Sequence, residues 1–252
     1  EPAQVGVITT TTIIEYITEN TPISRPNHGA PVGTLGRALA DLVSGLENGY
    51  RRMSVCAASG SGKSWIAEQA AKYLNFKFTF LHATDIDSFP LHQEETYGHL
   101  LYIEDADEQC QSMELFPGKQ EKLVLFWRRL EEIASDNKRY VILGFRELHS
   151  VDKYYMSEWL ESVVYIQFPD ITERLYILKQ LTSNESQLDI TRIAELTSGC
   201  MFDDLCRLLV HLKSDIFTDI HEQINNFSTS VQSRFKMDID RSVTWDTLAG
   251  LR

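Results

Sequence analysis

Eight consecutive residues have the types and spacing of a phosphate-binding loop. The pattern for such a loop is G-x-x-x-x-G-K-[ST], and the chain reads Ala57-Ala58-Ser59-Gly60-Ser61-Gly62-Lys63-Ser64. The second glycine, the lysine and the hydroxyl residue are present, but Ala57 stands where the pattern has its first glycine. An apolar run at 52–56 precedes the loop, and a segment with helical periodicity at 64–74 follows it. This context favours a phosphate-binding loop over a turn of small residues.

The chemistry of such a loop depends on backbone N–H groups and on one cation. Gly60 and Gly62 let the backbone turn tightly, so that its N–H groups converge on phosphate oxygens. Lys63 would reach the outer phosphates, and the hydroxyl of Ser64 would bind Mg²⁺. We therefore predict that ATP or ADP binds the following residues: Ala58, Ser59, Gly60, Ser61, Gly62, Lys63, Ser64 and Trp65.

The loop's one departure from the pattern has a cost that depends on backbone conformation. A Cβ at Ala57 costs about 1–2 kcal/mol if that residue has a positive φ. With a negative φ the alanine costs almost nothing. Nucleotide binding is therefore expected, while nucleotide hydrolysis is left open.

Two acids follow an apolar run later in the chain and could hold a metal ion. The run at 99–103 ends in Glu104 and Asp105. A loop of this kind needs one carboxylate for the hydration shell of Mg²⁺ and another to polarise the attacking water. We predict Ser64 and Glu104 as metal ligands, and Glu104 and Asp105 as impaired catalytic residues. The alternative is that both are solvated acids at the end of a strand.

Strands and helices are expected to alternate around these residues. Such alternation is typical of a parallel α/β sheet with its ligand at the carboxyl ends of the strands. The expected helices are 34–46, 64–74 and 119–135, and the expected strands are 52–56, 76–82, 99–103, 140–144 and 163–168.

The strand signals stop after residue 170, and short helical segments replace them. We expect these helices at 172–181, 190–197, 203–213 and 214–226. The predicted organisation is a linker or edge segment at 1–32, an α/β core at 33–170, an all-α lid at 171–228 and a linker at 229–252.

The composition limits the classes of function. The chain has 252 residues, 43% of them hydrophobic, and a formal net charge of -12, which argues against binding to nucleic acid. No apolar run approaches the ~20 residues of a membrane span. The spacing of the cysteines matches no zinc pattern and fits a reducing compartment.

These motifs, taken in order, resemble those of AAA ATPase modules. The loop, the acidic strand end, the segments Val163–Leu178 and Glu195–Leu205, and the final SVTWDTLAGL all follow the family's order. The resemblance implies an α/β core with a helical lid, binding of ATP or ADP with Mg²⁺, and assembly into a homo- or hetero-hexamer. The last segment resembles the opening of a second module, which implies that this chain is the first of two tandem modules and a fragment.

Several departures from the family weaken the expected hydrolysis. The family's usual order of the two acids is Asp then Glu, whereas this chain has Glu104 then Asp105. A catalytic base that is misplaced by ~1 Å can lower the rate about 10²-fold. The segment 144–147 offers no counterpart to the family's sensing asparagine. The positions of the family's arginine fingers fall near Met156 and Trp159. A missing finger can cost roughly 10³–10⁵ in rate.

Further departures affect the pore and the lid. The segment between Asp85 and Gly98 is short, so no pore aromatic can be carried over, although Phe89 and Tyr97 are near. Phe202-Asp203 stands where the family has small residues near the nucleotide.

A degenerate first module with an intact second one is typical of the peroxisomal peroxin ATPases. That resemblance implies a nucleotide-binding, hydrolysis-impaired module that serves ring assembly in a motor for recycling the peroxisomal import receptor. It also implies a cytoplasmic location and recruitment to the peroxisomal membrane only through a partner. Two alternatives are an active module of another type II member (segregase, membrane-fusion or ribosome-biogenesis type) and a nucleotide-free interaction domain.

Overall fold

The computed structural model describes residues 33–91, 97–112, 118, 120–182 and 189–214. The expected linkers at 1–32 and 229–252, and most of the helix expected at 214–226, lie outside the described residues. The chain divides into two compact units. The described residues of one lie within Thr34–Gln167, and those of the other are Gly33, 168–182 and 189–214. The division falls slightly before the boundary predicted at residue 170.

The first unit is an α/β fold built on a five-stranded sheet. Every strand pairing is parallel, and the spatial order is β2-β3-β4-β1-β5. The strands are β1 (Arg52–Cys56), β2 (Lys77–His82), β3 (His99–Glu104), β4 (Arg139–Phe145) and β5 (Ser162–Tyr165). The predicted parallel sheet is confirmed, with β1 in its interior beside β4 and β5.

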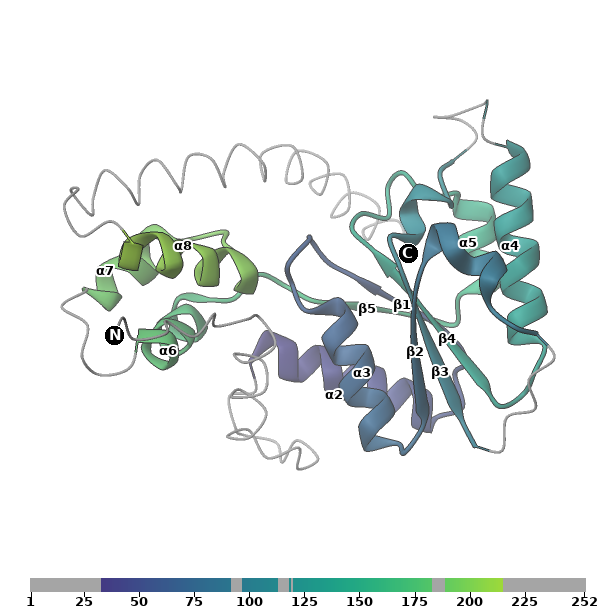
Figure 1. Cartoon of the computed structure of the whole chain (residues 1–252), viewed down its shortest axis with the longest axis horizontal. Coiled ribbons are helices and arrows are strands. Elements are labelled where there is room, and N and C mark those ends of the chain that lie inside the picture. The colour runs from purple at the N-terminus through teal and green to yellow at the C-terminus, as the bar shows by residue number, and fades with distance from the viewer. Residues whose placement is uncertain (1–32, 92–96, 113–117, 119, 183–188, 215–252) are drawn as a thin grey trace, which may run out of the picture. The chain divides into compact units, whose positions relative to one another are not determined.

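Helices cover both faces of this sheet (Figure 1). The helices of this unit are α2 (Thr34–Glu47), α3 (Lys63–Tyr73), α4 (Gln120–Ala134) and α5 (Lys153–Trp159), with short 3-10 turns η1 (Ala83–Ser88) and η2 (Ala106–Glu108). Helices α2 and α3 lie on one face, and α4 and α5 lie on the other. The burial of both faces explains why β3 reads as a continuous apolar run rather than an alternating one.

The core on the α4 face shows how periodicity in the sequence becomes packing. Helix α4 buries Leu123, Phe126, Leu130 and Ile133, which recur at helical spacing. They pack with inward-facing residues of β3 and β4 and with Trp159 of α5. The sequence predicted α4 but missed α5, a short helix capped by the carboxylate of Asp152, which accepts from two backbone N–H groups.

One predicted strand is longer than the one observed. The expected strand at 163–168 ends at Tyr165, although Ile166 still donates a backbone hydrogen bond to Cys56. Among the described strands, β5 pairs with β1 alone, and β1 ends at Cys56. Residues beyond 166 therefore extend past the end of the described strand with which β5 pairs.

The second unit is helical in its described part. It contains α6 (Ile171–Thr182), α7 (Ile190–Leu196) and α8 (Phe202–Ser214). Asp170 and Glu173 cap α6 reciprocally, and Gly199, with φ 82°, follows the end of α7. The buried Arg174 side chain donates to the carbonyls of Pro169 and Ala194, which fastens α6 to α7. The predicted helical region after the sheet is confirmed for the described residues.

None of the described helices is both long enough and apolar enough to cross a membrane.

Candidate nucleotide-binding site

The loop between β1 and α3 folds as a tight turn that depends on two glycines. Gly60 has φ 75°, and Gly62, the residue that caps the N-terminus of α3, has φ 89°. Side chains are unfavourable in this left-handed region. A Cβ on Gly62 would also lie 3.1 Å from Cδ2 of Leu35. The loop therefore leads directly into the N-terminus of α3. The backbone N–H groups and the dipole at a helix N-terminus favour an anion.

Ala57 lies at the start of this loop without strain. Its N–H donates to the carbonyl of Phe145 at 3.0 Å, which continues the pairing of β1 with β4. Among the described non-glycine residues, only Asn75 and Asp105 have positive φ. Ala57 is therefore outside the left-handed region, and the case in which the alanine costs almost nothing applies.

Lys63 is the first residue of α3 and is almost fully buried, with 4% of its side chain exposed. Its Nζ donates to the carbonyl of Ala57 at 3.2 Å and to that of Ala58 at 3.5 Å. The same Nζ lies 3.6 Å from Oε1 of Glu104. The structure thus brings the predicted cation and the first predicted acid together at the carboxyl edge of the sheet.

Glu104 ends β3, and both of its carboxylate oxygens are engaged. Tyr102 Oη donates to Oε2 at 2.6 Å, while Oε1 faces Lys63. Burial raises the pKa of Tyr102 far above its ordinary value, and the charge of Glu104 raises it further. The neighbouring strand leaves room for this phenol at Gly144, where a Cβ would collide with Tyr102 Oη. Sequence reasoning missed Tyr102, although it lies two residues from Glu104 on the same face of β3.

Asp105, the second predicted acid, points to a different partner. It has φ 55°, and its Oδ1 lies 3.5 Å from Nε of Arg146. Nε also lies 3.4 Å from Oδ2 of Asp107, and another guanidinium nitrogen of Arg146 lies 2.5 Å from Oε1 of Glu108. Burial alone would lower the pKa of Arg146, but the three carboxylates outweigh it and raise that pKa. The two acids predicted as a pair are therefore held by different cations.

The remaining predicted loop residues differ in exposure. Ser59 lies at the exposed tip, while Ala58, Gly60 and Ser64 are half-buried. The hydroxyl of Ser61 and the indole N–H of Trp65 are buried, and neither has a hydrogen-bond partner among the described residues. An unsatisfied buried hydroxyl costs about 1–3 kcal/mol, so Ser61 is a candidate for contact with a ligand in this loop.

The predicted metal ligands Ser64 and Glu104 would supply one hydroxyl and one carboxylate, of which the carboxylate is engaged by Lys63 and Tyr102 in this structure. Mg²⁺ is typically held by one or two carboxylates, with waters and substrate phosphates completing its shell, so this donor set fits Mg²⁺ accompanied by a nucleotide. Within the described residues, no three acids, histidines or cysteines are grouped to hold a metal on their own. A metal at this site would therefore arrive with a phosphate ligand.

Cys56, the last residue of β1, lies near several charged side chains at this edge of the sheet. Burial is the largest cause that raises its pKa, to about 12. Lys63 acts in the opposite direction, and Asp107 and Glu147 add to the increase. These three charged side chains are thus close enough to the end of β1 to act on one thiol.

The predicted finger positions are part of the core. Trp159 is 3% exposed and packs on Trp127 with ring centroids 5.6 Å apart. Met156, on the same helix α5, packs against the same core. Trp159 is therefore buried in the core of its own unit, whereas Met156 is only partly buried.

Phe202 and Asp203, which stand where the family has small residues near the nucleotide, are the first two residues of α8. Phe202 is buried, and Asp203 pairs with Arg207 at 2.5 Å. Both residues thus have partners within the helical unit.

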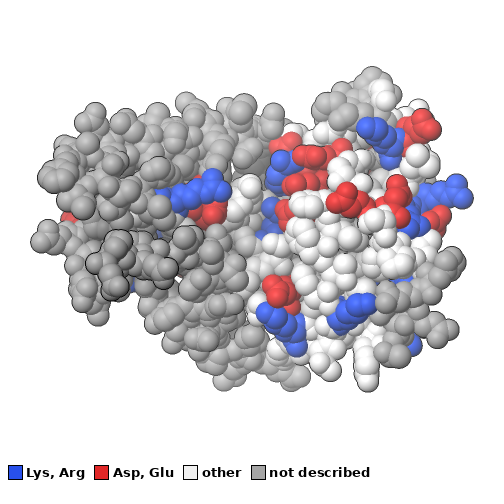
Figure 2. All heavy atoms as spheres, in the orientation of Figure 1, with Lys and Arg blue, Asp and Glu red and all other residues white. Residues whose placement is uncertain are grey.

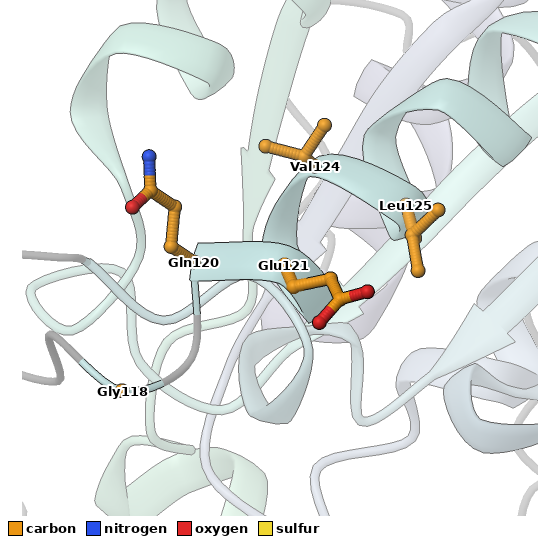
Figure 3. Close-up of a pocket in the computed structure, with 5 residues that line it drawn as sticks. All are labelled: Gly118, Gln120, Glu121, Val124 and Leu125. Atoms are coloured by element: carbon orange, nitrogen blue, oxygen red, sulfur yellow. The ribbon is translucent and has the colours of Figure 1, made fainter.

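A separate pocket of about 440 Å³ lies at the start of α4. The residues that line it are Gly118, Gln120, Glu121, Val124 and Leu125. Their side chains diverge rather than converge on one point (Figure 3). With a single carboxylate and none of the loop residues, this pocket offers no recognisable chemistry.

Charges of both signs are interspersed on the described surface that Figure 2 shows. Lys and Arg side chains lie beside Asp and Glu side chains over this face, and the acids gather in small groups. The described part of this face carries no continuous basic patch of the kind that binds a nucleic-acid backbone.

Comparison with protein-family models and with curated proteins finds no match to this chain. The structure itself defines an α/β fold with a five-stranded parallel sheet followed by a helical region.

Proposed function

We propose that this chain is a nucleotide-binding module of the AAA type in which hydrolysis is impaired. The observation that carries the proposal is the placement of Lys63. Its buried amine stands at the N-terminus of α3, after two left-handed glycines, and lies 3.6 Å from Glu104 at the end of β3. This combines a helix N-terminus, a cation and a carboxylate, which are the groups that bind a phosphate chain with Mg²⁺.

The impairment is supported by the surroundings of the second acid and of the finger positions. Asp105 faces Arg146 rather than Lys63 or Glu104. Trp159 is buried in the core. A module with these features would bind ATP or ADP as a ligand that stabilises its folded and assembled state, because any ligand that binds only the native state raises stability.

The wider role extends the sequence resemblance. We place the chain as the first module of a tandem AAA motor that assembles as a homo- or hetero-hexamer and unfolds or extracts proteins. The peroxisomal peroxin ATPases are the members it resembles, so the corresponding substrate is the peroxisomal import receptor, reached from the cytoplasm and through a partner at the membrane. The motif order quoted above supports this assignment.

Calorimetric titration of the chain with ATP, in the presence and absence of Mg²⁺, tests nucleotide binding. We expect saturable binding that Lys63→Ala weakens by at least about 10-fold, because the variant loses a charge-assisted contact worth roughly 1.5–3 kcal/mol. Lys72→Ala is the matched control, since Lys72 lies on the same helix and its side chain is 62% exposed. Equal loss in both variants, or no heat and no thermal shift with any nucleotide, would reject the proposal.

One observation favours a second function, that of a nucleotide-free interaction domain. Lys63 already has two carbonyl acceptors and an ion pair within the protein, so the loop could act as a packing element. The same titration decides between the two functions. A folded chain that gives no heat with ATP or ADP would leave only the interaction role.

A further inference from the structure

Arg146 connects two turns at the carboxyl edge of the sheet. It follows β4 directly, whereas Asp105, Asp107 and Glu108 belong to the turn after β3. The parallel register pairs Ile103 with Leu143, so the ends of the two strands are neighbours. This register places the guanidinium of Arg146 beside the three carboxylates of the turn after β3.

Both the backbone and the side chain of Arg146 are fixed in place. Its N–H donates to Oδ1 of Asp107 at 3.4 Å, and its Nε donates to Oδ2 of the same carboxylate at 3.4 Å. The Asp107 side chain is 7% exposed, so this anchor is buried. Glu108 holds another nitrogen of the guanidinium at 2.5 Å. Arg146 is therefore positioned by two acids even before its contact with Asp105 is considered.

Asp105 is the acid that this arrangement affects. Its backbone is in the left-handed region at φ 55° and ψ 34°, and its Oδ1 lies 3.5 Å from Arg146 Nε. A general base must have a free lone pair within hydrogen-bond reach of the proton that it abstracts. The ion pair with Arg146 directs one oxygen of Asp105 toward the end of β4, away from Lys63 and Glu104, although the Asp105 side chain is still 37% exposed.

We infer that Arg146 is a positioning residue that holds Asp105 away from the attacking water and so keeps hydrolysis slow. This inference rests on the proposed function and adds a cause for the impairment. In the reaction that Arg146 restrains, the oxygen of water bonds to the terminal phosphorus of ATP, and the bond from that phosphorus to the ADP oxygen breaks. The water proton passes to the Asp105 carboxylate and then to solvent, and ADP and phosphate leave.

Single-turnover hydrolysis of ATP by the full chain with Mg²⁺ tests the inference. Arg146→Gln should raise the rate constant by at least about 10-fold. This is less than the roughly 10²–10⁴-fold typical of a positioned base, because aspartate is one methylene shorter than glutamate. Arg146→Lys keeps the charge but cannot reach all three carboxylates, so its gain should be smaller. The lysine variant also keeps the test usable if Arg146→Gln does not fold. Arg128→Gln, which removes an exposed pair with Glu132, should change nothing.

The gain must depend on Asp105. The double variant Arg146→Gln with Asp105→Asn should return to the wild-type rate, and ATP affinity should change less than the rate constant in every variant. A gain that persists without Asp105, or none in either Arg146 variant that binds ATP, would overturn the inference and leave the proposed function standing. A wild-type chain that binds no ATP would overturn both.

Discussion

The amine of Lys63 lies 3.6 Å from Oε1 of Glu104, so the cation of the loop and the acid at the end of β3 form one ion pair across two elements. Only 4% of the lysine side chain and 19% of the glutamate side chain are exposed. When phosphates bind Lys63, they compete with Glu104 for the lysine charge. The Glu104 carboxylate is then close to a second anion, which repels it. A divalent cation between the two anions removes this repulsion. Nucleotide affinity should therefore depend on the metal because of the Glu104 carboxylate.

Replacement of Glu104 with glutamine should therefore uncouple nucleotide affinity from Mg²⁺. We expect Glu104→Gln to bind metal-free ATP about 10-fold more tightly than the wild type does, a change of about 1.4 kcal/mol, and to gain little when Mg²⁺ is added. Calorimetry with and without the metal measures both quantities. Asp41→Asn, at an exposed acid of α2, is the control. An unchanged ratio of the two affinities in Glu104→Gln would show that this carboxylate has no part in metal binding.

Restoration of the missing glycine should bring no benefit to nucleotide binding. Because Ala57 lies outside the left-handed region, Ala57→Gly should leave ATP affinity within about 2-fold. It should lower the free energy of unfolding by roughly 0.5–1 kcal/mol, since glycine gains more freedom in the unfolded chain. Gly62→Ala should cost at least about 1 kcal/mol, because its φ is 89°. Urea unfolding and calorimetry check both variants, and tighter binding by Ala57→Gly would contradict the assignment of its backbone.

The sequence predicted the sheet and the loop because both leave local signals. Apolar runs, two glycines and a lysine at fixed spacing do not depend on distant residues. The predicted strands at 52–56 and 99–103 agree with β1 and β3 to within a residue. The helix after the loop begins at Lys63, one residue before its predicted start.

The partners of the acids were not predictable in the same way. Arg146 is 41 residues from Asp105 in the sequence, and only the pairing of β3 with β4 brings them together. The sequence placed the segment 144–147, which contains Arg146, where a sensing asparagine was expected. No local pattern shows that a guanidinium after one strand contacts an acid after another. Helix α5 was missed for a related reason: it has seven residues and buries only Trp159 fully, too little for a periodic signal.

An arginine introduced at the predicted finger position should destabilise the protein rather than activate it. Trp159 is 3% exposed, and the guanidinium of Arg52 already lies 5.9 Å from its ring centroid. Trp159→Arg would remove a buried aromatic side chain, a loss of about 3–5 kcal/mol, and place a second cation near the first. Glu158→Arg, at an exposed neighbour, should change stability by less than about 0.5 kcal/mol. Urea unfolding measures both, and a Trp159→Arg chain of wild-type stability would contradict the buried placement of this residue.

The four cysteines are all free thiols, and the folded chain should protect them from alkylation. Burial raises the pKa of Cys56 to about 12 and that of Cys206 to about 12, and it raises the pKa of Cys110 well above its ordinary value. Only the thiolate reacts, and a shift from 9.0 to about 12 reduces its population about 10³-fold at pH 8. Iodoacetamide should therefore label Cys56 at least about 100-fold more slowly in the native chain than in urea.

As the pH rises above 9, the labelling rate in urea should level off, while the rate in the native chain should continue to increase, because the native Cys56 thiol is still protonated. Peptide mass spectrometry over a pH series follows both rates at each cysteine. Equal rates for native and unfolded Cys56 at pH 8 would show that this thiol does not experience the buried environment beside Lys63.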